Sequence, residues 1–164
     1  MRKSIIIFLT ILSTTILKVG AVTDNESKIE ELKAQVDSLS HEVLFIKLSY
    51  GLQIIQNELN IFTGEVNSKI MEISMDVRLK NCSRNSYLTY TENYEIFRDS
   101  LELYKSRYKS QQSLVYGALL YRNWNDNEYT VLNGLCNYID LTYQRAELVL
   151  NTMKEMLELY HKLV

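Results

Sequence analysis

The sequence predicts an all-α fold, an up-down-up three-helix bundle with a long, coiled-coil-like first helix. The chain of 164 residues has no proline and five glycines. Helix interiors exclude proline, whereas sandwiches and barrels need frequent turn residues. Apolar residues recur at helical spacing in three long stretches, which two polar segments, 81–85 and 123–127, separate. We therefore expect helices at about 24–80, 87–122 and 126–163.

The first stretch carries two apolar stripes in succession. The first stripe has 3-4-3-4-3 spacing and consists of Ile29, Leu32, Val36, Leu39, Val43 and Ile46. This period of 3.5 residues is typical of a coiled-coil seam. The second stripe is offset by two residues and continues from Phe45 to Val77. Thr23 and Glu26 have the spacing of a capping box at the start of the helix.

The first helix is expected to be longer than the other two, so its residues 24–47 should project beyond the bundle. The first stripe would then face water and need a partner, because a lone helix is marginally stable. Its β-branched a positions and the leucines at two of its three d positions favour two parallel strands. A homodimer and a different protein partner both remain open. A bend near Gly51, which lowers helix stability by only about 1 kcal/mol, would instead return the segment to its own bundle.

The second stretch has an aromatic seam at heptad spacing. Its tyrosines are Tyr87, Tyr90, Tyr94, Tyr104 and Tyr108. One interpretation places them in the core, with their hydroxyls at its rim. The other makes them an aromatic face for a protein partner or a glycan, since tyrosine offers a large contact area at low entropic cost.

The third stretch has the widest apolar face. Its seam runs from Leu132 to Leu163, and a second row of apolar residues lies beside it. A face of this width packs against two neighbouring helices. Asn125, followed three residues later by Glu128, is expected to cap this helix.

Residues 1–21 are predicted to be a cleaved signal peptide. Arg2 and Lys3 precede an apolar run of about 13 residues, and Val19-Gly20-Ala21 supplies small residues for cleavage. The run is short for a membrane span, which needs roughly 20 residues. The mature chain, 22–164, would be exported to the periplasm or the extracellular space and would not remain in the membrane.

The charge of the mature chain argues against polyanionic partners. Without the three basic residues of the signal, 15 basic and 20 acidic side chains remain, a net charge of −5. An acidic chain without a basic cluster is a poor candidate for binding nucleic acid or an anionic membrane surface.

No arrangement of residues predicts catalysis, a cofactor or a metal. Glu158 and His161 have the Glu-x-x-His spacing of di-iron bundles, but a second copy is missing and both should face solvent. Residues 123–127 alternate oxygen ligands as a calcium loop does, but Glu128 stands where glycine is required. We therefore expect a protein that is not an enzyme.

The two cysteines are predicted to be too far apart for an intramolecular disulfide. Cys82 lies at the top of the first helix and Cys136 about ten residues above the opposite turn. Helical rise separates them by roughly 35–40 Å, whereas a disulfide needs Cα atoms within about 7 Å.

Together these patterns favour an exported, non-catalytic interaction or structural protein of the cell envelope, which acts through coiled-coil and aromatic helix faces. In plan, an exported chain of long helices resembles periplasmic accessory proteins of secretion and conjugation machines and coiled-coil proteins that bridge an envelope. The alternative is a helical carrier that holds an apolar ligand between its helices, for which Met153 and Met156 are candidate contacts.

Overall fold

The computed structural model describes residues 22–164, with side chains from residue 27 onward. This part of the chain forms three α-helices and no strand: α2 (Val22–Arg78), α3 (Arg84–Tyr121) and α4 (Asp126–His161). The all-helical prediction is confirmed, and each helix lies within a few residues of its expected range. The predicted signal peptide, 1–21, falls outside the described residues, so its cleavage stays a prediction.

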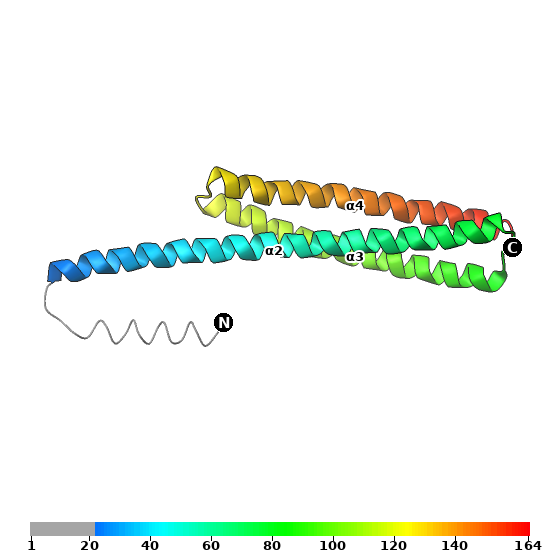
Figure 1. Cartoon of the computed structure of the whole chain (residues 1–164), viewed down its shortest axis with the longest axis horizontal. Coiled ribbons are helices and arrows are strands. Elements are labelled where there is room, and N and C mark those ends of the chain that lie inside the picture. Colours follow the sequence, from blue (N-terminus) through cyan, green and yellow to red (C-terminus); the bar gives the residue numbers. More distant parts are fainter. Residues whose placement is uncertain (1–21) are drawn as a thin grey trace. The chain divides into compact units, whose positions relative to one another are not determined.

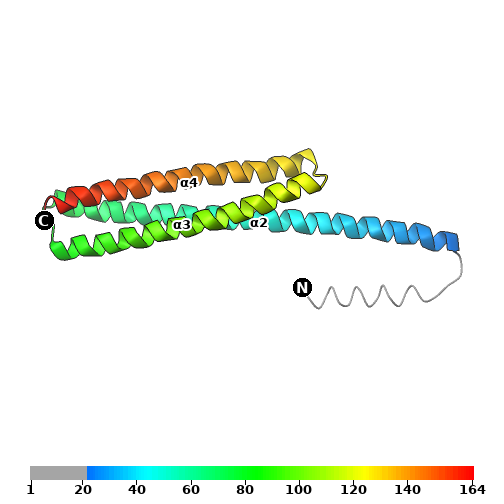
Figure 2. The same cartoon turned by 180° about the vertical axis from the view of Figure 1, so that it is seen from behind.

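The chain divides into two units, at Val43 and Leu44. In the first unit, the described residues belong to the N-terminal part of α2. The second unit, 44–164, contains the rest of α2 together with α3 and α4. Figures 1 and 2 show these three helical segments packed side by side, with the C-terminus next to the turn between α2 and α3.

The hydrophobic core lies entirely within residues 44–164 and follows the predicted seams. On α2 the second stripe is buried as expected; its fully or nearly fully buried members are Leu48, Leu52, Ile55, Leu59, Phe62, Val66 and Ile73. On α4 the wide face is also confirmed; it buries Leu132, Cys136, Ile139, Thr142, Tyr143, Ala146, Leu150, Met153, Leu157 and Tyr160. Periodicity therefore identified most core positions on both helices, but Leu163, the predicted end of the α4 seam, is 54% exposed, and Cys136 is buried although it lies outside the predicted seam.

The turn after α2 ends the helix without a glycine. Lys80 adopts a left-handed backbone conformation with φ 54°. Its N–H donates to the Val77 carbonyl (3.3 Å), and the Asn81 N–H donates to the Asp76 carbonyl (2.9 Å). These two bonds form a Schellman motif, which satisfies carbonyls that the helix end would otherwise leave free.

The turn between α3 and α4 is fixed by two sets of hydrogen bonds. The Asn125 side chain accepts from the Glu128 N–H (2.9 Å), and the Glu128 carboxylate accepts from the Asn125 N–H (3.2 Å). This reciprocal pair is the capping box that the sequence predicts. The Trp124 indole N–H donates to the Ala118 carbonyl (2.9 Å), so the turn folds back onto the end of α3.

Candidate interaction surfaces

The N-terminal part of α2 exposes a row of large apolar side chains. We call Ile29, Leu32, Val36, Leu39 and Val43 the N-terminal stripe; their exposed fractions lie between 40% for Leu32 and 63% for Val43. Ile46, the last predicted member of the row, belongs to the bundle unit and is 55% exposed. None of these side chains contributes to the hydrophobic core of residues 44–164. These side chains are exposed, and their role as a partner-binding surface stays a prediction.

Gly51, near which the alternative places a bend, lies inside the continuous helix α2. The absence of a side chain at Gly51 allows α3 to approach α2 closely. A Cβ atom added there would lie 2.5 Å from Nε2 of Gln111 on α3. That Gln111 amide reaches across to the Leu48 carbonyl at 3.4 Å.

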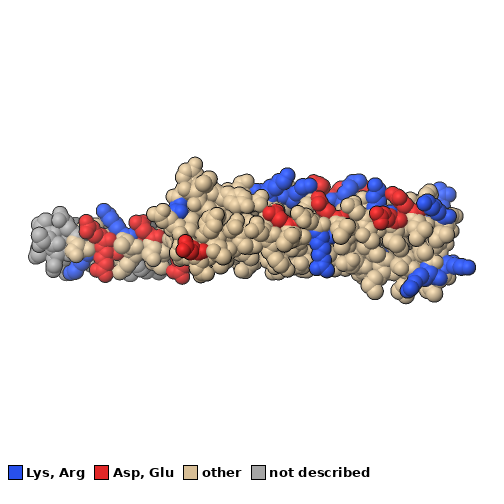
Figure 3. Space-filling model, turned by 90° about the horizontal axis from the view of Figure 1, so that it is seen from above, with Lys and Arg blue, Asp and Glu red and all other residues tan. Residues whose placement is uncertain are grey.

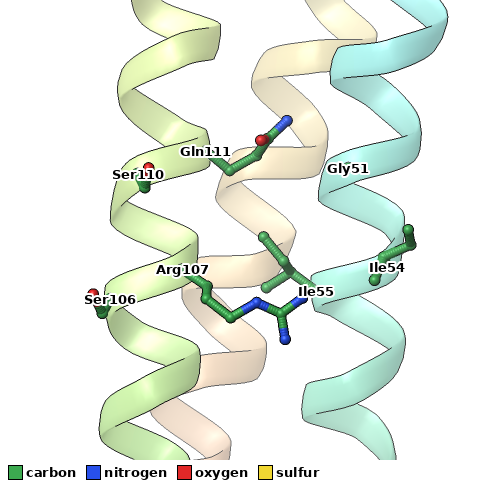
Figure 4. A pocket seen from close by; sticks show the side chains of 7 residues that line it. All are labelled: Gly51, Ile54, Ile55, Ser106, Arg107, Ser110 and Gln111. Carbon is green, nitrogen blue, oxygen red and sulfur yellow. The ribbon is translucent and has the colours of Figure 1, made fainter.

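A shallow pocket of about 380 Å³ lies beside this approach, between α2 and α3. Figure 4 shows Arg107 and Gln111 reaching from α3 toward α2, whereas Ser106 lies on the outer flank of α3 and Ile54 points away from the pocket. Arg107 is held by Glu58 of α2 at 2.8 Å. The pocket is open and has a polar rim, so it lacks the enclosed apolar volume that holds a small ligand.

The aromatic seam of α3 faces the bundle. Tyr108 is buried, with 5% of its surface exposed, and the other four predicted tyrosines are half-buried against the core. The Tyr104 ring packs edge-on against Phe62 of α2, with 5.9 Å between ring centroids. The Tyr108 hydroxyl donates to the Cys136 carbonyl of α4 at 2.9 Å. The structure thus places the seam in the core, as the first interpretation of the tyrosines expects. Partner contact through their exposed edges stays a prediction.

A polar cluster joins all three helices next to the α2–α3 turn. The Tyr90 hydroxyl of α3 donates to Asp76 Oδ2 of α2 at 2.9 Å. The Tyr160 hydroxyl of α4 lies 3.5 Å from the same oxygen and accepts from the Ser83 N–H at 3.1 Å. Burial, reinforced by the hydrogen bond to Asp76, raises the pKa of Tyr90 to about 12. The cluster therefore consists of two tyrosine hydroxyls around the Asp76 carboxylate, which is a structural arrangement.

Neither metal hypothesis gains support from residue positions. Glu158 and His161 both point to solvent, and the His161 ring stacks on Tyr87 with 4.8 Å between centroids. Asn125 and Glu128 cap α4 and do not form a cation loop. Among the side chains of residues 27–164, no three of the histidine, cysteine and acidic types gather as metal ligands.

Both cysteines are free, as their predicted separation requires. Cys82 is half-buried at the α2–α3 turn, where its thiol contacts the Asp76 carbonyl. Cys136 is fully buried on α4, and burial raises the pKa of its thiol to about 11. The Ser83 N–H, next to Cys82, donates to the Tyr160 hydroxyl, so Cys82 lies near Tyr160. The helical rise between positions 136 and 160 of α4 amounts to about 36 Å. This distance is far too long for a disulfide.

The candidate carrier contacts belong to the core: Met153 is fully buried and Met156 is half-buried. Among the three helices of residues 22–164, none has the length and apolar content that crossing a membrane requires. No protein-family model matches the chain, no curated protein matches it, and no solved structure matches it.

Proposed function

We propose that this chain is an exported, non-catalytic interaction protein that self-associates through the N-terminal stripe of α2. In this proposal the stripes of two copies form a parallel, two-stranded coiled coil, and each copy carries an up-down-up bundle. The observation that carries the proposal is the set of five large apolar side chains, at heptad spacing, that are 40–63% exposed. Scattered exposed apolar residues are common on proteins, but a contiguous row indicates an interaction site.

A second copy of this chain is favoured as the occupant by the residue types of the stripe. Its a positions, Ile29, Val36 and Val43, are β-branched, and its d positions, Leu32 and Leu39, are leucines. This combination is the one that favours parallel dimers over trimers and tetramers. It is also self-complementary, as a symmetric dimer requires.

The test is sedimentation of the mature protein beside the double variant Leu32→Asp/Leu39→Asp. Truncating a buried leucine costs about 2–5 kcal/mol, and the variant removes two from each strand. We expect the dimer dissociation constant to rise by at least about 1000-fold, which corresponds to roughly 4 kcal/mol.

The matched control is Ala34→Asp/Ser38→Asp, which adds the same charge to exposed positions off the stripe. The control should remain dimeric, and both variants should keep the helical circular dichroism of the wild type. A wild type that sediments as a monomer at every concentration would remove the basis of the proposal. A dimer that both double variants weaken equally would show that added charge, not the stripe, controls association.

A further inference from the structure

The end of the bundle at the α2–α3 turn carries four exposed cations, and Asp76, the acid beside them, is half-buried and hydrogen-bonded to Tyr90. Arg78, Lys80 and Arg84 lie within seven positions of the sequence, and residues 77–91 contain no Asp or Glu. Lys162, just after α4, adds a fourth cation, because Tyr160 bonds the Ser83 N–H of this turn. All four side chains are exposed. We call these four residues the basic tip.

The basic tip stands out against the rest of the bundle surface. In Figure 3, blue and red side chains alternate along the bundle, but only blue ones project at the end beside the α2–α3 turn. The ion pairs along the bundle neutralise cations elsewhere; Arg107 pairs with Glu58, for example, and Lys105 with Glu147. None of the ion pairs within residues 28–164 involves the basic tip. Glu158, one turn before Lys162, is the nearest exposed acid in the sequence and does not pair with it.

Helix-end electrostatics account for only part of this cluster. A cation stabilises the negative C-terminal end of a helix, which explains Arg78 at the end of α2 and Lys162 after α4. Arg84 is different, because it is the first residue of α3 and α3 has no acid in its first turn. The helix dipole disfavours a cation at that position. The positive N-terminal end of α3 partly offsets the negative C-terminal ends of α2 and α4 at the tip.

Exposed apolar side chains stand among these cations. Leu79 lies between Arg78 and Lys80 and is 72% exposed, and Leu163 follows Lys162 and is 54% exposed. Nothing in the bundle covers either side chain. Cations that surround exposed leucines fit a surface that is both anionic and apolar beneath its charges, which is the structure of an anionic lipid headgroup layer. A purely acidic protein face would leave the leucines without apolar contacts.

We propose that the basic tip docks the protein on an anionic lipid surface, with its cations at the headgroups and Leu79 inserted between them. This revises the expectation from the overall charge, because a chain that is acidic in total presents a locally basic end. The site is separate from the N-terminal stripe and does not rest on self-association. It goes beyond the proposed function by naming a second kind of partner.

The test is co-sedimentation of the exported mature protein with vesicles. One set contains phosphatidylcholine alone, and the other includes 30% phosphatidylglycerol, each at low and at physiological salt. Intact mass first confirms the N-terminus of the protein. We expect binding to the anionic vesicles only, and weaker binding at the higher salt because exposed charges are screened.

The informative variant is Lys80→Gln/Arg84→Gln, and Lys109→Gln/Lys154→Gln is its matched control, since both control lysines are exposed and lie away from the tip. Each basic side chain near an anionic surface contributes roughly a factor of five in partitioning. The tip variant should therefore bind about 30-fold more weakly, while the control binds nearly as the wild type does. Equal losses in the two variants, or no binding of the wild type, would overturn the proposal.

Leu79→Ser separates a lipid surface from other polyanions. Leu79→Ser should weaken binding to the anionic vesicles, because the inserted leucine is lost. The factor should be several-fold larger than the factor by which physiological salt weakens binding of the wild type. If Leu79→Ser binds as the wild type does, and soluble polyglutamate displaces the protein from vesicles, then the tip recognises negative charge in general and the lipid proposal is wrong. Tight, salt-insensitive binding to neutral vesicles would also contradict it.

Discussion

The hydroxyl of Tyr160 is expected to stabilise the bundle, because it connects α4 to the turn between α2 and α3. Its side chain is fully buried, accepts from the Ser83 N–H at 3.1 Å, and lies 3.5 Å from Asp76 Oδ2. Tyr160→Phe keeps the ring and its edge-on contact with Tyr90, at 5.7 Å between centroids. The substitution therefore removes the hydrogen bonds while it leaves the packing in place.

The expected loss follows from the groups left behind. The Ser83 N–H loses its acceptor, whereas Asp76 keeps the hydrogen bond from Tyr90. A lost hydrogen bond with a partly buried donor costs about 1–2 kcal/mol, since water reaches the exposed side of the turn. For a domain of this size, each kcal/mol shifts Tm by roughly 3 °C, so Tm should fall by about 3–6 °C.

Thermal and urea unfolding followed by circular dichroism measure this loss. The matched control is Tyr121→Phe, because Tyr121 is 88% exposed and its substitution should change stability by no more than about 0.5 kcal/mol. If Tyr160→Phe unfolds at the same urea concentration as the control, the Tyr160 hydroxyl contributes nothing and the account of this cluster is wrong.

Two further predictions concern helix interiors and alkaline pH. Gly64, Gly117 and Gly134 lie within helices where an added Cβ meets no atom within 4 Å. Replacing all three by alanine should therefore raise the free energy of unfolding, measured by urea unfolding, by about 2 kcal/mol. Gly51→Ala is crowded by Gln111 and should stabilise the protein less than any of the three single replacements; an equal stabilisation would contradict the close approach of α3 at Gly51. Tyr90 has its pKa raised from 10.0 to about 12, so its contribution is complete below pH 10 and disappears as pH rises from 10 through 12. Tyr90→Phe should lessen the loss of stability over that range in a pH series of urea unfolding, and an unchanged loss would contradict the link.

The sequence predicted the core because burial follows periodicity. The second stripe of α2 is buried where the offset from the first stripe placed it, and the wide face of α4 packs against both neighbours. Cys136 lies outside the predicted seam of α4 yet is fully buried, because a free cysteine packs as a small hydrophobic residue. Burial of Cys136 follows from its position between Leu132 and Ile139 on the same helix face.

Periodicity could not settle what covers a face. The N-terminal stripe and the aromatic seam have the same heptad spacing, yet Leu39 is 55% exposed and Tyr108 is 5% exposed. The spacing shows which residues share a face; whether a neighbour covers that face depends on how the chain folds. The basic tip was missed for a related reason. The expectation that the chain has no basic cluster overlooked the acid-free segment from Arg78 to Arg84, and the approach of Lys162 required the tertiary structure.

The hydrophobic core and the N-terminal stripe use different residues, so association and bundle stability can be measured separately. Every side chain of the hydrophobic core comes from residues 44–164, and none comes from the N-terminal stripe. An interaction that stabilised the bundle itself would place some stripe side chains in that core. Because residues 44–164 form this core by themselves, the bundle should keep its stability when charges are introduced at Leu32 and Leu39. The effect of such a variant on association can therefore be measured without a matching loss in the stability of the bundle, so a change in sedimentation reports on the interface and not on unfolding.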